Sequence, residues 1–150
     1  MHHPIQDSPG RDAHRAPALA IPSCPVPTAY QGVWRRDWIE SHPAGNLTPV
    51  RNGQPAIWFQ SPCYHVDLRV NPALPPSARP GDAGFSQQMA FAGRTEVGTQ
   101  HGRAHCRWVP DIACPARPVD DVDDGFMQFE SATHLLEYGT DGSYVESWRR

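Results

Sequence analysis

Short segments in which apolar and polar residues alternate occupy most of the chain after residue 30, and Pro and Gly separate them. Such segments are typical of antiparallel β-strands joined by turns. They lie at 32–39, 56–60, 63–70, 94–97, 104–109, 125–130, 134–138 and 143–148. Asp141-Gly142, between the last two segments, is a strong hairpin signal. The sequence therefore predicts an all-β fold, an antiparallel meander of about eight strands.

Two regions depart from this alternation. Apolar residues at 85, 89 and 91, with Ser86 as a cap residue, predict one short helix. Residues 1–29 are rich in Pro and polar residues and predict a disordered tail. The remaining residues, 30–150, are long enough for one domain with its own core.

Composition excludes several classes of partner. The formal charge of −3 argues against nucleic acid and anionic membranes. No run approaches the length of a membrane span, and the apolar stretch 16–21 is too short for a signal peptide and contains Pro17. These features predict a cytoplasmic protein in which the four cysteines are free thiols.

Metal-ligand residue types occur without the spacing that a metal site needs. Cys63-x-His65 and His101-x3-His105-Cys106 match no zinc pattern, and the acidic residues at 120–124 lack EF-hand spacing. The sequence also lacks a recognisable set of nucleophile, base and orienting residue. We therefore expect no metal and no cofactor, and assign no catalytic residue.

The third predicted strand has two chemically distinct faces. Cys63, His65, Asp67 and Arg69 share one face, and the alternate residues 64, 66, 68 and 70 form an apolar face. Two interpretations stay open. In the simpler one the apolar face packs inward. In the other the polar face lines a barrel interior, where Asp67 pairs with Arg69 or with Arg36 of the first strand.

Several short motifs, taken in order, resemble a family of bacterial lipocalin-like proteins of the calycin type. The resemblance covers 30–150 and implies a β-barrel without an established activity. The chain ends at Arg150 inside a strand pattern. Either the barrel closes with these strands, or it is incomplete at the C-terminus and leaves an open edge. The matching motifs are Gly32-Val33-Trp34-Arg35-Arg36, Tyr64-x-Val66-Asp67-Leu68-Arg69, Phe91-Ala92-Gly93, Cys106-x-Trp108, Phe129-Glu130, Glu137-Tyr138-Gly139 and Tyr144-x-Glu146-x-Trp148.

A barrel of this size predicts a binding module for a small molecule, an acidic one among the candidates, held in the barrel interior. The expected apolar walls are Trp34, Trp58, Tyr64, Trp108 and Tyr144, and the expected polar anchors are Arg36, Asp67, Arg69 and Glu146.

Two alternatives stay open. The first is a cofactor-free enzyme, decarboxylase-like or lyase-like, that acts on a small carboxylate. Arg36 would anchor the substrate, Tyr64 or Tyr144 would orient it, and Glu146 would be the acid or base. A buried Glu146 with a raised pKa would favour this alternative. The second is an interaction module that uses an open sheet edge, and a homodimer is its simplest form.

Overall fold

A computed structural model describes residues 25–42, 50–53, 55–79, 81–85, 88–116, 118 and 122–150. The predicted tail up to residue 24 lies outside the described residues. Nine strands and no helix occur in the described part. The strands are β1 (Gly32–Ser41), β2 (Val50–Asn52), β3 (Ala56–Gln60), β4 (Tyr64–Arg69), β5 (Met89–Gln100), β6 (Arg103–Cys114), β7 (Asp123–Ser131), β8 (His134–Gly139) and β9 (Tyr144–Arg149).

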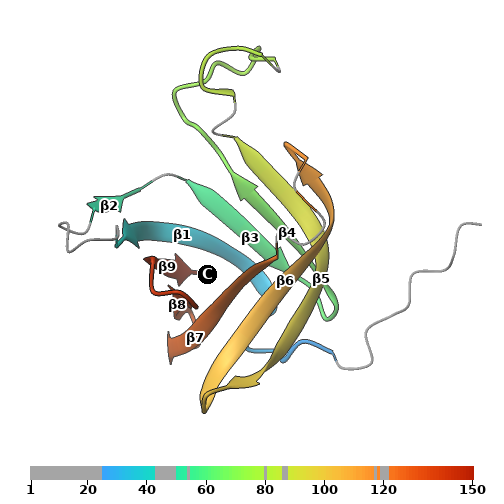
Figure 1. Ribbon diagram of the computed structural model, residues 1–150, viewed down its shortest axis with the longest axis vertical. Helices are drawn as coiled ribbons and strands as arrows, with labels where there is room; N and C mark the ends of the chain where they lie inside the picture. The colour runs from blue at the N-terminus through green and yellow to red at the C-terminus, as the bar shows by residue number, and fades with distance from the viewer. Residues whose placement is uncertain are drawn as a thin grey trace, which may run out of the picture.

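Eight of these strands close into an antiparallel barrel (Figure 1). The sheet runs β1-β3-β4-β5-β6-β7-β8-β9 in chain order, and β9 returns to pair with β1 from Arg35↔Arg149 to Ser41↔Tyr144. The short strand β2 pairs with the far end of β1. The predicted all-β meander is thus confirmed. The alternative of an open edge at the last strand is wrong, because β1 supplies the hydrogen-bonding partner of β9.

The short helix predicted near residue 85 falls partly on residues 86–87, which lie outside the described residues. At its start the Gln88 N–H donates to the Phe85 carbonyl oxygen at 2.9 Å, which is one turn, and from Met89 onward the chain is a strand. Met89 begins β5, a strand of 12 residues that pairs with β4 on one side and β6 on the other. Met89 and Phe91 also fit the two-residue period of a strand, so the apolar spacing was compatible with both structures. The long neighbour β6, joined through His101-Gly102, decides in favour of the strand. Both turn residues have positive φ, as a two-residue hairpin turn requires.

Four tryptophans from four strands fill the barrel. Trp34, Trp58, Trp108 and Trp148 are all at most 5% exposed. Trp58 is central, with its ring centroid 6.0 Å from Trp34, 5.5 Å from Trp108 and 6.0 Å from Trp148. This packing is the main apolar content of the core.

One end of the barrel is closed by the segment that precedes β1. Val26 and Tyr30 are buried there, and the Trp34 indole nitrogen donates a hydrogen bond of 2.7 Å to the Tyr30 carbonyl oxygen. Tyr30 also meets Phe129 edge to face. The packed part of the chain thus reaches back to Val26, four residues before the expected boundary at residue 30. At the opposite end, the connection between β4 and β5 projects away from the barrel (Figure 1).

The polar face of β4 lines the interior. His65 and Asp67 are buried, whereas Val66 and Leu68 on the opposite face are 37% and 41% exposed. The simpler interpretation, with the apolar face inward, is therefore wrong. The interior tryptophans already fill the apolar space, and the inward polar side chains find hydrogen-bonding partners there.

The outer face of the barrel carries a row of apolar residues that crosses several strands. Register places five residues side by side across β1, β3, β4, β5 and β6, namely Val33, Phe59, Val66, Ala92 and Ile112. Phe59 is 46% and Ile112 68% exposed. A groove of about 170 Å³ lies along part of this row, between β4 and β6. Apolar residues therefore occur on both faces of the barrel wall, which is why apolarity alone does not identify the inner one.

Cys63, Cys106 and Cys114 are free thiols, as predicted, and Cys24 lies outside the described residues. Helices long and apolar enough to cross a membrane were sought in the described part of the chain, and none was found.

Candidate functional site

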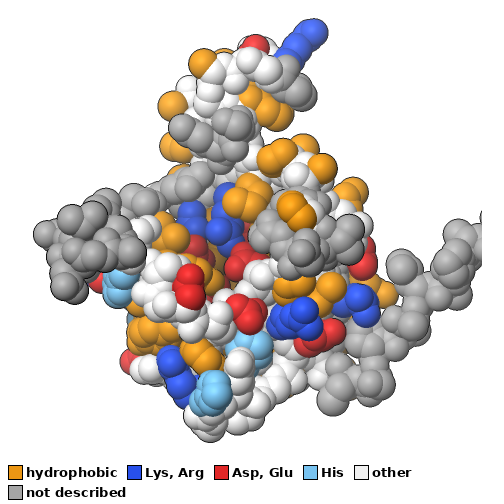
Figure 2. All heavy atoms as spheres, in the orientation of Figure 1, with side chains coloured by type: hydrophobic (Ala, Val, Ile, Leu, Met, Phe, Trp, Pro, Cys, Tyr) orange, Lys and Arg blue, Asp and Glu red, His pale blue; other side chains and the backbone are white. Residues whose placement is uncertain are grey.

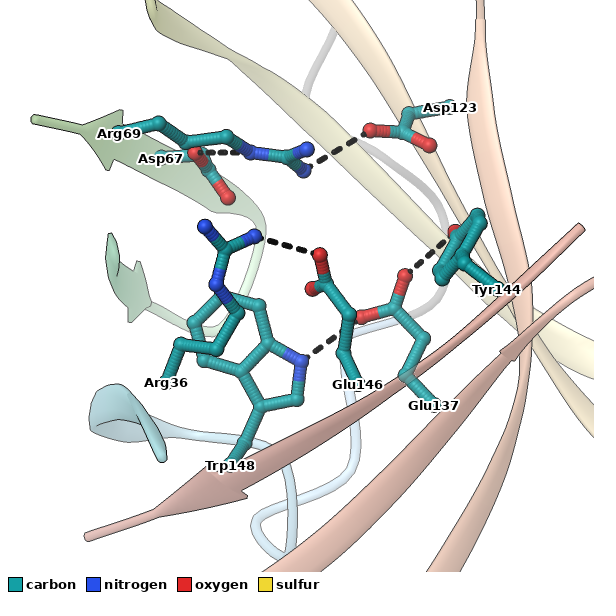
Figure 3. A network of polar contacts seen from close by, with 8 residues as sticks. All are labelled: Arg36, Asp67, Arg69, Asp123, Glu137, Tyr144, Glu146 and Trp148. Carbon is teal, nitrogen blue, oxygen red and sulfur yellow. Dashed lines mark hydrogen bonds and ion pairs between the residues drawn. The ribbon is translucent and has the colours of Figure 1, made fainter. Parts of the chain in front are cut away.

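Charged side chains from five strands meet inside the barrel near its open end (Figure 3). We call this group the interior cluster. Figure 2 shows acidic and basic side chains gathered in a recess at this end of the molecule. The interior cluster comprises Arg36 of β1, Asp67 and Arg69 of β4, Asp123 of β7, Glu137 of β8, and Tyr144, Glu146 and Trp148 of β9.

The deepest contact is an ion pair between Arg36 and Glu146. A guanidinium nitrogen of Arg36 lies 2.6 Å from Glu146 Oε1, and each side chain is 1% exposed. A β-bulge in β1 separates Arg36, which points inward, from Asp37 and Trp38. Asp37 pairs instead with Arg149 on the outside, where both side chains are exposed. The bulge thus interrupts the two-residue alternation of β1 after Arg36.

Arg69 lies at the mouth of the barrel, because it is the last residue of β4. Its Nε donates to Asp67 at 3.1 Å, and a terminal nitrogen donates to Asp123 at 3.2 Å. The Arg69 and Asp123 side chains are 19% and 21% exposed, whereas that of Asp67 is 7% exposed. Arg69 therefore pairs with one carboxylate inside the barrel, that of Asp67, and with one at the partly exposed mouth, that of Asp123.

Glu137 is held by neutral donors. The Tyr144 hydroxyl donates to Glu137 Oε1 at 2.8 Å, and the Trp148 indole nitrogen donates to Oε2 at 3.0 Å. Register places Glu137 directly opposite Glu146 across β8 and β9. Two carboxyl groups that face each other in this way disfavour simultaneous ionisation.

Burial raises the pKa of three interior carboxyl groups. For Glu137 the pKa lies well above 4.5, first because of burial and second because of the nearby Glu146. Burial also raises the pKa of Glu146 and of Asp67, against the lowering effect of Arg69. The Tyr144 pKa is raised as well, by burial and then by Glu137.

Aromatic rings and carboxyl groups line a cavity next to these side chains. It has about 10 Å³ of space for the centre of a water molecule, which is room for about one water. The interior is thus nearly filled, and a larger ligand would have to displace side chains at the mouth. The lining residues are Trp58, Asp67, Arg69, Phe91, Trp108, Asp123, Glu137 and Trp148.

Three buried polar atoms lack a hydrogen-bonding partner among the described residues. They are Glu146 Oε2, Trp108 Nε1 and His65 Nε2. Burial lowers the pKa of His65 to about 4, so this ring is neutral, and its Nδ1 lies 3.1 Å from the Thr95 hydroxyl. An unpartnered buried polar atom is costly. Of these three residues, Trp108 lines the cavity, so its indole N–H is the unpartnered donor that a bound molecule there would meet.

Two glycines make room for the interior cluster. Gly125 and Gly139 pair with each other across β7 and β8. A Cβ on Gly125 would lie 2.8 Å from the Glu137 side chain, and a Cβ on Gly139 would lie 2.7 Å from the Tyr144 ring. The contact between Tyr144 and Glu137 thus depends on glycine at these positions.

The variant Gly139→Ala is expected to lower the free energy of unfolding by about 1–3 kcal/mol, because the added methyl group forces the Tyr144 ring away from Glu137. Gly98→Ala is the matched control, since no atom lies within 4 Å of the added Cβ on the same kind of strand. The control should be neutral or stabilising by up to about 1 kcal/mol. Urea unfolding of both variants is the measurement. Equal stability of the two would contradict the close contact.

Most of the predicted site residues come together. Trp34, Arg36, Trp58, Asp67, Arg69, Trp108, Tyr144 and Glu146 all point into the barrel. Tyr64 does not, because it alternates with the buried His65 and belongs to the outer face of β4. Trp34 lies nearer the closed end, beside Tyr30.

Sequence reasoning missed Phe91, Asp123, Glu137 and Trp148 as site residues. Glu137 and Trp148 share inward faces with Leu135 and Glu146, so alternation could have found them. Phe91 was assigned to a helix, and Asp123 was considered only as part of an acidic run without EF-hand spacing. The beginning of β7 at Asp123 places this carboxylate directly opposite Trp108.

In the described part of the chain, no group of three or more His, Cys, Asp or Glu side chains is arranged to hold a metal ion. Comparison with known proteins found no matching family model, no matching curated protein and no matching solved structure.

Proposed function

We propose that this protein is a lipocalin-like binding module that holds a small molecule at the open end of its barrel. The arrangement of the strands supports this, since an eight-stranded up-and-down barrel is the architecture that lipocalins use. The expected ligand position is the cavity bordered by Asp67, Arg69, Asp123 and Glu137.

The observation that carries this proposal is the concentration of ionisable groups inside the barrel. Two arginines and four acidic side chains meet there, although burying charges costs free energy and an apolar core of similar volume is often more stable. Stability alone therefore does not account for the interior cluster. A ligand that pairs with these groups would account for them.

The interior indoles provide a direct test by NMR. A mixed set of cationic, neutral and anionic fragments is added to the full chain. At least one fragment is expected to shift the indole N–H signals of Trp58, Trp108 and Trp148, which line the cavity. The Trp38 signal is the internal control, because this ring packs against Arg51 on β2, 3.8 Å from the guanidinium carbon. If no fragment moves the three cavity signals, the proposal is wrong.

A second candidate function, proton transfer on a small substrate, is favoured by one observation. Glu146 is buried with a raised pKa and faces Glu137, a combination suited to acid–base chemistry. A different observation weighs against the carboxylate substrate expected from the sequence: Arg36, its proposed anchor, is paired with Glu146. Any fragment that binds would be examined for chemical conversion, and unchanged fragments would favour simple binding.

The homodimer and the cytoplasmic location expected from the sequence stay predictions. The apolar row on the outer face is the surface that a homodimer would use.

A further inference from the structure

The large apolar side chains that are exposed in the described part of the chain gather on one outer face of the barrel. Strand register joins Val33, Phe59 and Val66 into the apolar row, and Leu68 lies two residues further along β4. Single exposed apolar residues are ordinary on a protein surface, whereas a contiguous patch marks a surface that something covers. The complete set is Val33, Phe59, Val66, Leu68, Val70 and Ile112.

Small residues on β5 form the floor of the groove in this face. Ala90 and Ala92 present only methyl groups there. Val66 of β4 forms one wall, and Ile112 and Cys114 of β6 form the other. The groove has about 170 Å³ of space. An apolar cavity of about 150 Å³ holds one benzene molecule, so the groove has room for about one large apolar side chain.

The described chain begins beside this face. The Val26 N–H donates to the Pro62 carbonyl oxygen at 2.6 Å, which places residue 25 next to the turn between β3 and β4. From Pro62 it is about 13 Å along β4 to Val66 and about 20 Å to Leu68. The chain that precedes Val26 spans up to about 17 Å back to Ile21 and up to about 24 Å back to Leu19. Both residues are therefore within reach of the groove.

The sequence before residue 25 contains an apolar stretch of suitable length. Residues 16–21 read Ala-Pro-Ala-Leu-Ala-Ile. Leu19 and Ile21 are its large side chains and stand two positions apart, which places them on the same side of an extended chain. Pro22 follows Ile21, and the residue before a proline favours extended backbone.

We propose that residues 16–21 bind along the outer groove and cover the apolar row. Ile21 packs against Val66 and Ile112, and Leu19 packs two residues further along, beside Ala90 and Cys114. The short connection favours this occupant over a second copy of the chain, because a tethered segment has an effective concentration on the order of millimolar. This surface is separate from the barrel interior, and the inference does not depend on the proposed binding function.

Contacts between methyl groups test the proposal directly. The full chain is labelled at its Ile, Leu and Val methyl groups, and nuclear Overhauser effects are recorded by NMR. Contacts are expected between Ile21 or Leu19 and the methyl groups of Val66 and Ile112. Ile5, an apolar residue outside the stretch 16–21, is the internal control and should show no contact with Ile112. If neither Leu19 nor Ile21 contacts the groove residues, the proposal is overturned.

A matched pair of variants gives a second readout, since the exposed Cys114 thiol lies in the groove. Leu19→Ser combined with Ile21→Ser removes the apolar side chains of the segment, and Ile5→Ser is the control. Alkylation of Cys114 by iodoacetamide, followed by mass spectrometry, should be about tenfold faster in the double variant, as expected when about nine in ten wild-type molecules hold the segment bound. The control should react at the wild-type rate.

Equal rates in the double variant and the wild type would overturn the proposal. The NMR spectra also report on the competing occupant. If the Ile112 methyl signal shifts with protein concentration and is unaffected by the double variant, a second copy covers the groove, and the assignment to residues 16–21 is overturned.

Discussion

Replacing Arg36 with leucine is expected to lower the free energy of unfolding by about 3–5 kcal/mol near pH 8. The reason is the partner that stays behind. Glu146 is 1% exposed and accepts a 2.6 Å contact from Arg36, so the variant leaves an uncompensated carboxylate inside the barrel. Loss of one partner from a buried pair is among the largest effects that a single substitution can have.

The size of this effect should depend on pH. Burial already raises the pKa of Glu146, although Arg69 and Arg36 act against it. Without Arg36 the pKa rises further, and near pH 5 the carboxyl group of the variant accepts a proton instead of remaining charged. The destabilisation should therefore be smaller at pH 5 than at pH 8.

Arg149→Leu is the control for this prediction. Arg149 pairs with Asp37 at 3.2 Å, but their side chains are 58% and 45% exposed. A pair in water contributes less than about 1 kcal/mol. Urea unfolding of both variants at the two pH values is the measurement. If Arg36→Leu costs no more than Arg149→Leu, the ion pair inside the barrel does not have the importance assigned to it.

The strands could be predicted because their alternation and turn residues are local signals. Asp141-Gly142 forms the predicted hairpin, and Gly142 has the positive φ that such a turn requires. The helix predicted near residue 85 was wrong from Met89 onward, where the chain is a strand, since Met89 and Phe91 fit both periods over so short a segment. Only the pairing with β6, a contact between distant residues, decides between them.

The inward face of each strand was harder to predict, for a physical reason. The barrel interior is filled by tryptophans from four strands and by paired charges, while Val66, Leu68 and Ile112 remain on the outside. A rule that places apolar residues inward fails when the interior carries its own ion pairs. Asp67 and Arg69 could be placed only as one of two alternatives, and the structure decides for the polar interior.

Glu137 shows what sequence reasoning lacks most. Its alternation with Leu135 places it on an inner face, but its role depends on contacts with Tyr144, Trp148 and Glu146 from the next strand. The bulge that turns Asp37 outward while Arg36 stays inward is equally invisible in the pattern. Cross-strand register, which the sequence does not encode locally, creates the site.

The wild-type protein is expected to lose stability as the pH rises from 4.5 through the folded-state pKa of Glu137. Glu137 has a folded-state pKa well above 4.5, because burial and then the neighbouring Glu146 disfavour its charge. The folded chain therefore keeps a proton that the unfolded chain has released. This contribution to stability is fully present below pH 4.5 and is lost as the pH rises through the folded-state pKa, at up to about 1.4 kcal/mol per pH unit for one proton.

His65 acts in the opposite direction, which sets the pH window for the measurement. Its pKa falls from 6.5 to about 4 through burial, so its contribution is present above pH 6.5 and is lost as the pH falls toward 4. Below pH 6.5 the two effects oppose each other. At alkaline pH the buried Cys106 thiol, whose pKa burial also raises, adds a loss of its own. The unfolding free energy is therefore measured at several pH values above 6.5, where His65 no longer titrates.

The variant Glu137→Gln identifies the group responsible. Glutamine can accept the Trp148 hydrogen bond through its single oxygen and donate to the Tyr144 hydroxyl through its NH2 group, and it does not titrate. The loss of stability with rising pH should therefore be smaller in this variant, by up to about 1.4 kcal/mol per pH unit. His65→Gln should leave the alkaline loss intact and change only the acid side. An unchanged alkaline slope in Glu137→Gln would show that this residue does not hold the proton. A reduced slope would establish that the barrel interior holds a proton on Glu137, beside Glu146.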